Sequence, residues 1–159
     1  VGKTMELGSF YTRPTPPVGV KESRDLAHLH PELRKRFALV CQGYEAQTSR
    51  RLKITCTWRS PERQLELYQQ GRRGILGEKP VTWVDGKTQK SRHNVFPAQA
   101  VDVAVVVGGQ ISWQEELYHP LGPLCQAQGL LWGGSWKAPK KDVPHVELPA
   151  ELALGDDDA

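Results

Sequence analysis

The sequence predicts an α+β domain, because helical and strand-like hydrophobic patterns both occur in a chain that can form one core. Apolar residues recur at helical spacing over residues 33–44, where they would form one face of a helix. Residues 51–58 alternate between apolar and polar side chains, and residues 100–107 are an almost unbroken apolar run; both patterns are typical of strands. A chain of 159 residues with 38% apolar content is large enough to bury one such core.

The chain opens with a segment that shows no hydrophobic periodicity. Residues 1–24 contain prolines at positions 14, 16 and 17. This composition predicts an extended arm or the remnant of a tag. The first helix is expected to begin at Pro31, because proline is favoured at the first helical position.

The alternating strand is predicted to be half-buried, and Arg59 leaves it on the polar face. Ser60 then caps a second helix, Pro61 is its first residue, and Gly71 ends it. The glycine- and lysine-rich residues 72–92 predict a long loop that frames a cleft.

The apolar run at 100–107 shows little alternation, so we expect it to form a central strand. Asp102 lies inside this run. A buried carboxylate must be paired or bind a metal, because burying it bare costs too much free energy. Asp102 is therefore the most informative residue of the strand.

The chain is expected to turn after this strand at the glycine pair 108–109. Ser112 and Glu115 predict a capping box at the start of a helix, which Pro120 interrupts. A second short helix is then expected to end at Gly129.

The overall charge and hydropathy narrow the classes of function. The net charge is +3, and no platform of basic and aromatic residues is visible, which argues against nucleic-acid binding. No apolar run approaches the ~20 residues that span a bilayer, so we expect no membrane insertion. The N-terminus also lacks the apolar core of a signal peptide. The acidic residues 151–159 predict a flexible tail.

Three cysteines, Cys41, Cys56 and Cys125, are odd in number and lie in apolar contexts. We expect buried free thiols rather than a disulfide framework. A catalytic cysteine paired with a histidine is disfavoured, because none of the three sits at a helix start or beside a candidate base.

Two segments contain the side chains of a metal centre. His93 and Asp102 occur close together in the sequence, and His145 follows much later with Asp142 three residues ahead of it. Two imidazoles and one carboxylate form a three-ligand set, which leaves the fourth zinc position open as in catalytic sites. A spare carboxylate such as Asp142 is what a metal-assisted hydrolase needs to move protons. By spacing alone, ordinary surface or core-edge polar groups are the favoured interpretation of these residues.

The segments around these residues resemble the D-Ala-D-Ala peptidase family of zinc enzymes, the VanX and VanY type. The resemblance is greatest to its bacteriophage branch, the L-alanyl-D-glutamate endopeptidase endolysins. It covers roughly residues 30–149 and rests on motifs in the family's order: 57–72 (TWRSPERQLELYQQGR), 91–93 (SRH), 100–102 (AVD), 132–136 (WGGSW) and 142–147 (DVPHVE). Two features depart from the family pattern. The spacing from His93 to Asp102 is longer than in much of the family, and Thr57-Trp58 replaces an expected Gly-Tyr.

The resemblance implies a role for each principal residue. His93, Asp102 and His145 would bind one Zn²⁺ ion. Asp142 would act as the general base and pass the proton to the leaving amine, and Arg59 would face the oxyanion of the tetrahedral intermediate. The alternatives are a loop carboxylate paired with a neighbouring lysine for Asp142, and a surface arginine for Arg59.

Three further residues are candidates for substrate binding or for support of the metal ligands. Ser91 lies two residues before His93 on the same side of an extended segment, and would hydrogen-bond the ligands or the substrate. Glu147 shares a strand face with His145 and would orient its imidazole ring. Trp136 would form a wall of the cleft, with a position in the core as the alternative.

Together with the resemblance, the sequence predicts a catalytic domain at residues 25–150, with helices packed on one side of a small antiparallel sheet that carries the zinc site. The expected function is that of an endolysin, a zinc peptidase that hydrolyses the L-Ala–D-Glu bond in the stem peptides of bacterial peptidoglycan. The alternatives are a D-Ala-D-Ala carboxypeptidase or dipeptidase, and a non-catalytic zinc-containing binding module, against which the presence of Asp142 and Arg59 argues. We expect a monomer made in the host bacterial cytoplasm without a signal peptide. It would act on the cell wall, in the periplasm, after membrane permeabilisation.

Overall fold

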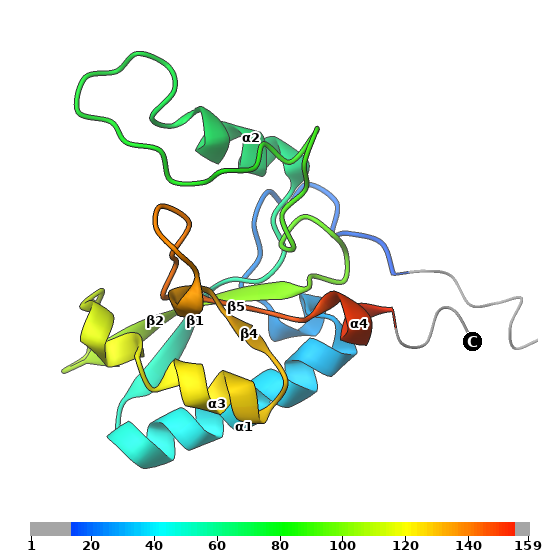
Figure 1. Ribbon diagram of the computed structural model, residues 1–159. Coiled ribbons are helices and arrows are strands. Elements are labelled where there is room, and N and C mark those ends of the chain that lie inside the picture. The colour runs from blue at the N-terminus through cyan, green and yellow to red at the C-terminus, as the bar shows by residue number, and fades with distance from the viewer. Residues whose placement is uncertain (1–13, 155–159) are drawn as a thin grey trace, which may run out of the picture.

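The computed structural model describes residues 14–154 and contains a five-stranded antiparallel sheet with helices packed alongside it (Figure 1). The strands are β1 (Arg51–Cys56), β2 (Ala100–Val107), β3 (Gln110–Ser112), β4 (Leu131–Trp132) and β5 (His145–Glu147). The helices are α1 (Pro31–Thr48), α2 (Pro61–Gln69), α3 (Leu121–Ala127) and α4 (Ala150–Ala153), with short 3₁₀ helices at Leu26–His28, Glu115–Tyr118 and Gly133–Ser135. The predicted α+β class is confirmed.

Strand β2 is central, as its apolar run predicts. It pairs antiparallel with β1 on one side and β5 on the other, in the order β1-β2-β5-β4, and β3 forms a hairpin with its end. The hairpin turn is Gly108-Gly109, where both residues have positive φ, a conformation that glycine adopts without steric cost. Val101, Val103 and Val105 of β2 are fully buried. Their packing holds the strand in place, and with it the alternate side chains, which include Asp102.

Helices α1 and α3 pack against each other on one face of the sheet, whereas α2 and the loop after it lie on the opposite side (Figure 1). Of the apolar residues predicted to form one face of α1, Cys41 is half-buried and the others, Leu33, Phe37, Val40 and Tyr44, are each at most 1% exposed. Helical periodicity in the sequence therefore identified the packed face of α1 correctly.

Helix α2 begins and ends as predicted. The Ser60 hydroxyl caps its N-terminus, Pro61 is its first residue, and Gly71 follows its end with a φ of +84°. A Cβ atom at Gly71 would lie 2.1 Å from the Pro80 nitrogen, so this position needs glycine. From Gln70 to Gln99 the chain is a long loop, which agrees with the prediction for residues 72–92.

The predicted capping box is wrong. Ser112 ends strand β3, where it pairs with Val105 of β2. Glu115–Tyr118 is a 3₁₀ helix without a side-chain cap. Pairing in the hairpin therefore outweighs the local tendency of Ser112 to start a helix, as tertiary context commonly does.

Strand β1 ends at Cys56, two residues earlier than the alternation predicts. A register shift between Ile54 and Cys56 interrupts its pairing with β2. Thr57 and Trp58 are both buried, so the alternation stops there. The irregular end of β1 turns the following residues toward the candidate site.

The two ends of the described chain are attached to the domain. Residues 21–23, within the predicted arm, make backbone hydrogen bonds to residues 57–60. Residues 150–153, at the start of the predicted tail, form α4, and Leu152 packs against the core. Residues 1–13 of the predicted arm and 155–159 of the tail lie outside the described residues. Within residues 14–154, no helix is both long and apolar enough to cross a membrane.

Candidate metal centre and active site

The register of the sheet brings two of the predicted ligands together. Asp102 on β2 is the direct partner of His145 on β5, and of Cys56 on β1 on its other side. Directly opposed residues project from the same face of a sheet with Cβ atoms ~5 Å apart. His145 Nδ1 is accordingly 3.1 Å from Asp102 Oδ1. Strand pairing therefore brings together two side chains that are 43 positions apart in the sequence.

His93 reaches the same carboxylate from the loop before β2. Its Nε2 lies 3.2 Å from Asp102 Oδ1, while its Nδ1 donates a hydrogen bond of 2.7 Å to the Thr57 carbonyl oxygen. A carbonyl only accepts, so Nε2 carries no proton in the neutral ring. Within the described part of the chain, this buried nitrogen has no hydrogen-bond partner. An orphaned imidazole nitrogen of this kind fits a metal ion.

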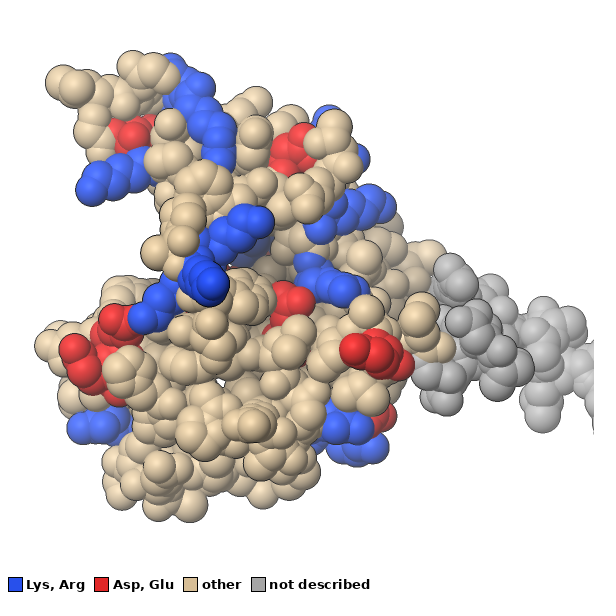
Figure 2. All heavy atoms as spheres, in the orientation of Figure 1, with Lys and Arg blue, Asp and Glu red and all other residues tan. Residues whose placement is uncertain are grey.

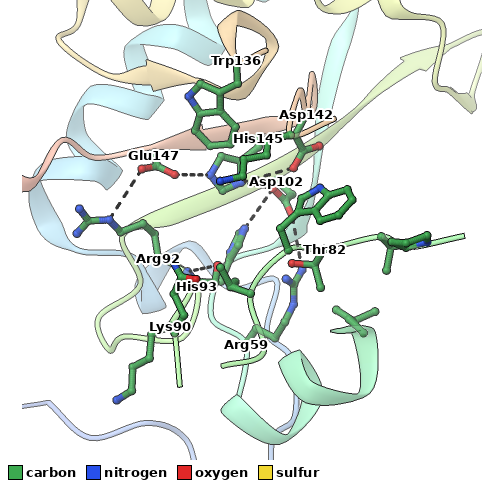
Figure 3. A pocket seen from close by; sticks show the side chains of 18 of the residues that line it. Arg59, Thr82, Lys90, Arg92, His93, Asp102, Trp136, Asp142, His145 and Glu147 are labelled. Carbon is green, nitrogen blue, oxygen red and sulfur yellow. Dashed lines mark hydrogen bonds and ion pairs between the residues drawn. The ribbon is translucent and has the colours of Figure 1, made fainter. Parts of the chain in front are cut away.

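His145 is oriented from behind by a carboxylate. Glu147 Oε1 lies 2.8 Å from its Nε2, which leaves Nδ1 facing Asp102 (Figure 3). Carboxylates commonly fix metal-binding histidines in this way, and the contact agrees with the role expected for Glu147. Burial opposes protonation of His145, but hydrogen bonds to Asp102 and Glu147 outweigh it and raise its pKa to about 10. The metal-free ring is therefore protonated at neutral pH.

Asp102 joins the two histidines. Burial opposes its ionisation, but the imidazoles of His93 and His145 outweigh burial and hold the pKa of Asp102 well below its usual range. Its carboxylate is therefore charged. Two imidazole nitrogens and one carboxylate oxygen are typical ligands of catalytic zinc, so the residues present fit a zinc ion.

Asp142 lies beside this set and is open to solvent. Its Oδ2 is 4.0 Å from His145 Nδ1, and its side chain is 49% exposed. Desolvation in the cleft and the charge of Asp102 raise the pKa of Asp142. The alternative of a lysine-paired loop carboxylate loses support, since Lys141 pairs with Glu115 instead. The position and the pKa suit a group that accepts a proton from water.

The WGGSW segment holds the loop that carries Asp142 and His145. The Trp132 indole N–H donates a hydrogen bond of 2.8 Å to the Val143 carbonyl oxygen, and the Asp142 N–H donates one of 2.9 Å to the Gly133 carbonyl oxygen. A Cβ atom at Gly133 would lie 2.3 Å from the Asp142 carbonyl oxygen. Trp132 and Gly133 were missed as supports of the site; the WGGSW string was the available signal, but its contacts are visible only in the fold.

Ser91 and Trp136 both line the cleft. The Ser91 hydroxyl accepts a hydrogen bond of 3.2 Å from the His93 N–H, within a turn rather than the extended segment that the sequence predicted. Ser91 therefore supports the backbone of His93. Trp136 packs against His145 with ring centroids 5.1 Å apart, as expected for a cleft wall rather than a core position.

Arg59 is mostly buried, with 13% of its side chain exposed, so it is not an ordinary surface arginine. Its Nη2 lies 3.5 Å from Asp102 Oδ2, and its Nη1 donates to Gln64 Oε1 at 3.0 Å. Gln64 is fully buried and also donates to the Thr82 hydroxyl and the Val84 carbonyl oxygen in the cleft loop. Sequence analysis gave Gln64 no role, although Gln64 lies in the family-like motif at residues 57–72.

Cys56 lies beside a histidine, contrary to the expectation that no cysteine would. Its Sγ is 3.7 Å from His93 Nδ1. That nitrogen already donates to a carbonyl and has no lone pair to accept the thiol proton. Burial also raises the pKa of the Cys56 thiol, and raises the pKa values of Cys41 and Cys125 to about 12. All three thiols are free, as predicted, and unsuited to nucleophilic catalysis.

The metal set lies on the floor of a cleft of about 620 Å³. One wall is the loop at residues 80–84, and the other includes Trp136 and residues 139–142. Figure 2 shows Lys and Arg side chains gathered around the hollow in this face. The lining cations other than Arg59 are Lys90, Arg92, Lys140 and Lys141. Such a lining favours an anionic substrate.

Two histidines and an aspartate in an open cleft, with a second carboxylate beside them, are typical of metal-dependent hydrolases. Residues 85–148 match the model of a peptidase M15 family described as D-alanyl-D-alanine carboxypeptidase. The fold is also similar to the crystal structure of the L-Ala D-Glu endopeptidase ChiX of Serratia marcescens. That match has 25% identity and a TM-score of 0.56, and covers 80% of this chain and 85% of that one. No curated protein sequence matches the chain significantly.

Proposed function

We propose that this protein is a zinc peptidase that hydrolyses the L-Ala–D-Glu bond in the stem peptides of bacterial peptidoglycan. The observation that carries the proposal is the convergence of His93, Asp102 and His145 on the cleft floor, with Asp142 beside them. The first three residues would hold one Zn²⁺, which supplies Lewis acidity and lowers the pKa of water toward ~7 when bound.

The side chains around the three zinc ligands carry out proton transfer, oxyanion stabilisation and peptide binding. Asp142 takes the proton of the attacking water and returns it to the leaving amine, because it is half-exposed and lies 4.0 Å from His145 Nδ1. Arg59 provides a permanent cation for the oxyanion of the tetrahedral intermediate. Its guanidinium lines the cleft and lies 3.5 Å from the carboxylate of Asp102, so it is close to the metal site (Figure 3). Trp136 and the loop at 80–84 confine the peptide between them.

The choice of bond is supported by the cleft and by similarity. The cleft has walls on two sides and a cationic lining, which suits the middle of an acidic peptide. The similar Serratia marcescens enzyme is described as an L-Ala D-Glu endopeptidase. The second candidate activity is D-alanyl-D-alanine carboxypeptidase, which is the description of the matching family model. The proposal includes the role of a phage endolysin that is made in the host cytoplasm and acts on the wall after membrane permeabilisation.

Digestion of purified bacterial sacculi tests the proposed bond. We expect new N-terminal D-Glu in the soluble fragments, with L-Ala left on the glycan strands, because the cut falls between these residues. Mass spectrometry after N-terminal labelling of the fragments measures both products. Release of free D-Ala with the L-Ala–D-Glu bond intact would assign the protein to the carboxypeptidases. Release of reducing sugar would remove it from the peptidases.

Replacing Arg59 with lysine tests the proposed oxyanion contact. Arg59→Lys should keep the fold and the zinc but lower kcat roughly 10-fold or more, because an ammonium cannot reproduce the forked guanidinium donors. Turnover of soluble muropeptides, together with zinc analysis of the purified variant, measures the effect. Arg63→Lys is the matched control, since within residues 14–154 the Arg63 side chain on α2 pairs with the exposed Glu66 alone. An unchanged kcat in Arg59→Lys would exclude the oxyanion role.

A further inference from the structure

A residue of the N-terminal segment holds the Arg59 guanidinium. Glu22 Oε1 accepts a hydrogen bond of 3.0 Å from Arg59 Nε. We infer that Glu22 is a positioning residue, which sets the plane of this guanidinium in the active site. The inference rests on the proposed peptidase function. It gives Glu22, which the sequence placed in an arm, a part in catalysis.

The backbone fixes Glu22 opposite Arg59. The two residues form an isolated antiparallel bridge, flanked by two backbone hydrogen bonds of 2.8 Å between residues 21–23 and 58–60. Such a pair is of the non-hydrogen-bonded type, in which facing side chains come closest. Ser23 next to it is buried. The carboxylate is therefore delivered to Arg59 by main-chain pairing.

The contact with Glu22 completes the restraint of the guanidinium. Of the five N–H donors of arginine, Nε carries a single one, and Glu22 accepts it. Gln64 Oε1 accepts from Nη1, and Cys56 Sγ lies 3.4 Å from Nη2. Contacts at all three nitrogens fix the plane. Nη2 also faces Asp102 Oδ2, and among residues 14–154 the second hydrogen of Nη1 is left for the substrate. A donor fixed in advance needs no reorganisation during the reaction.

Glu22 also balances the attraction of Asp102. In residues 14–154, these are the two carboxylates that form ion pairs with Arg59. Without Glu22, the guanidinium would be drawn toward Asp102, whose Oδ2 is now 3.5 Å from Nη2. That movement would take donors from the substrate and compete for the oxygens of a metal ligand. The side chains of Arg59 and Glu22 are 13% and 33% exposed, so solvent screens this pair less than an ordinary surface pair.

Kinetics of Glu22 variants on soluble muropeptides test the inference. Glu22→Ala should lower kcat about 10-fold with KM changed less than about threefold, because a transition-state contact is lost while substrate binding is kept. Glu22→Gln retains an acceptor for the Nε–H and should recover most of the lost kcat. The matched control is Lys21→Ala, which removes the exposed Lys21–Glu66 ion pair of the same segment and should change kcat less than about twofold. A Glu22→Ala enzyme with normal kcat would overturn the inference.

A double-mutant cycle distinguishes an effect of Glu22 on the position of Arg59 from a general effect on the fold. In an Arg59→Lys background, Glu22→Ala should cause no further loss, because its effect passes through the guanidinium. A full additional loss would contradict this. If Glu22→Ala does not fold or bind zinc, Glu22→Asp, which withdraws the carboxylate by one methylene, takes its place, and a normal kcat for Glu22→Asp overturns the inference.

A measurement independent of activity distinguishes failure of this inference from failure of the proposed function. In ¹H–¹⁵N spectra, the Arg59 Nε–H peak, assigned by its loss in Arg59→Lys, should exchange slowly with solvent. In Glu22→Ala the same peak should exchange fast or vanish. An unchanged peak excludes the positioning role. Sacculi that release no N-terminal D-Glu contradict the proposed bond only, and leave this test of Glu22 intact.

Discussion

Replacing His93, Asp102 or His145 with alanine should strip the zinc from the purified protein and abolish its peptidase activity. The side chain of each residue supplies one ligand atom, and the two imidazole nitrogens lie within 3.2 Å of Asp102 Oδ1. After loss of one residue, only two protein ligands remain, fewer than the three of a catalytic zinc site. Metal binding to the folded state adds to folding free energy, so Tm should also fall and no longer respond to added zinc. Metal analysis and thermal melts measure the two effects.

The release of protons on zinc binding provides a second test of the ligand assignment. With a pKa of about 10, the metal-free His145 is protonated at neutral pH. Zinc must displace that proton, so binding should release protons and should weaken as the pH falls below about 10. Calorimetry in buffers of different ionisation enthalpy counts the protons. The exposed His119 offers a control, because His119→Gln should keep stoichiometric zinc. Full zinc in all three alanine variants would refute the ligand assignment.

Asp142→Asn should keep the zinc and the fold but lose at least ~100-fold in kcat, because loss of a general base typically costs 10²–10⁴ in rate. The amide is nearly isosteric with the carboxylate but does not accept a proton from water. The backbone contacts that place the loop, from Asp142 N–H to Gly133 and from His145 N–H to Asp142, remain in the variant. Turnover of soluble muropeptides at matched zinc occupancy measures the loss.

A carboxylate outside the cleft provides the control for this variant. Glu116 is exposed on the 3₁₀ helix at Glu115–Tyr118, and Glu116→Gln removes one charge without touching the cleft lining. Its kcat should stay within about twofold of the wild type, as for most surface substitutions. If the Asp142→Asn enzyme were as active as this control, Asp142 would be a non-catalytic loop carboxylate and not the general base.

The sequence by itself determined the elements whose signals are local. Pro31 and the Ser60–Pro61 pair start their helices where propensity and capping place them. The apolar run of β2 became the central strand. Asp102 within it is half-buried and paired with two histidines, as the free-energy cost of desolvating a bare carboxylate requires. Family resemblance through short motifs added the candidate ligands, because the ligands and the strings around them lie together in the sequence.

Only the tertiary structure decided which distant residues meet. Ser112 was drawn into a hairpin instead of a helix cap, because strand pairing outweighs local propensity. Cys56 was brought beside His93 by the irregular end of β1. Glu22 met Arg59 through main-chain pairing of a segment that has no periodic signal. The last two contacts each join residues 37 positions apart. Their free energy comes from burial and backbone pairing that exist only after the sheet has formed.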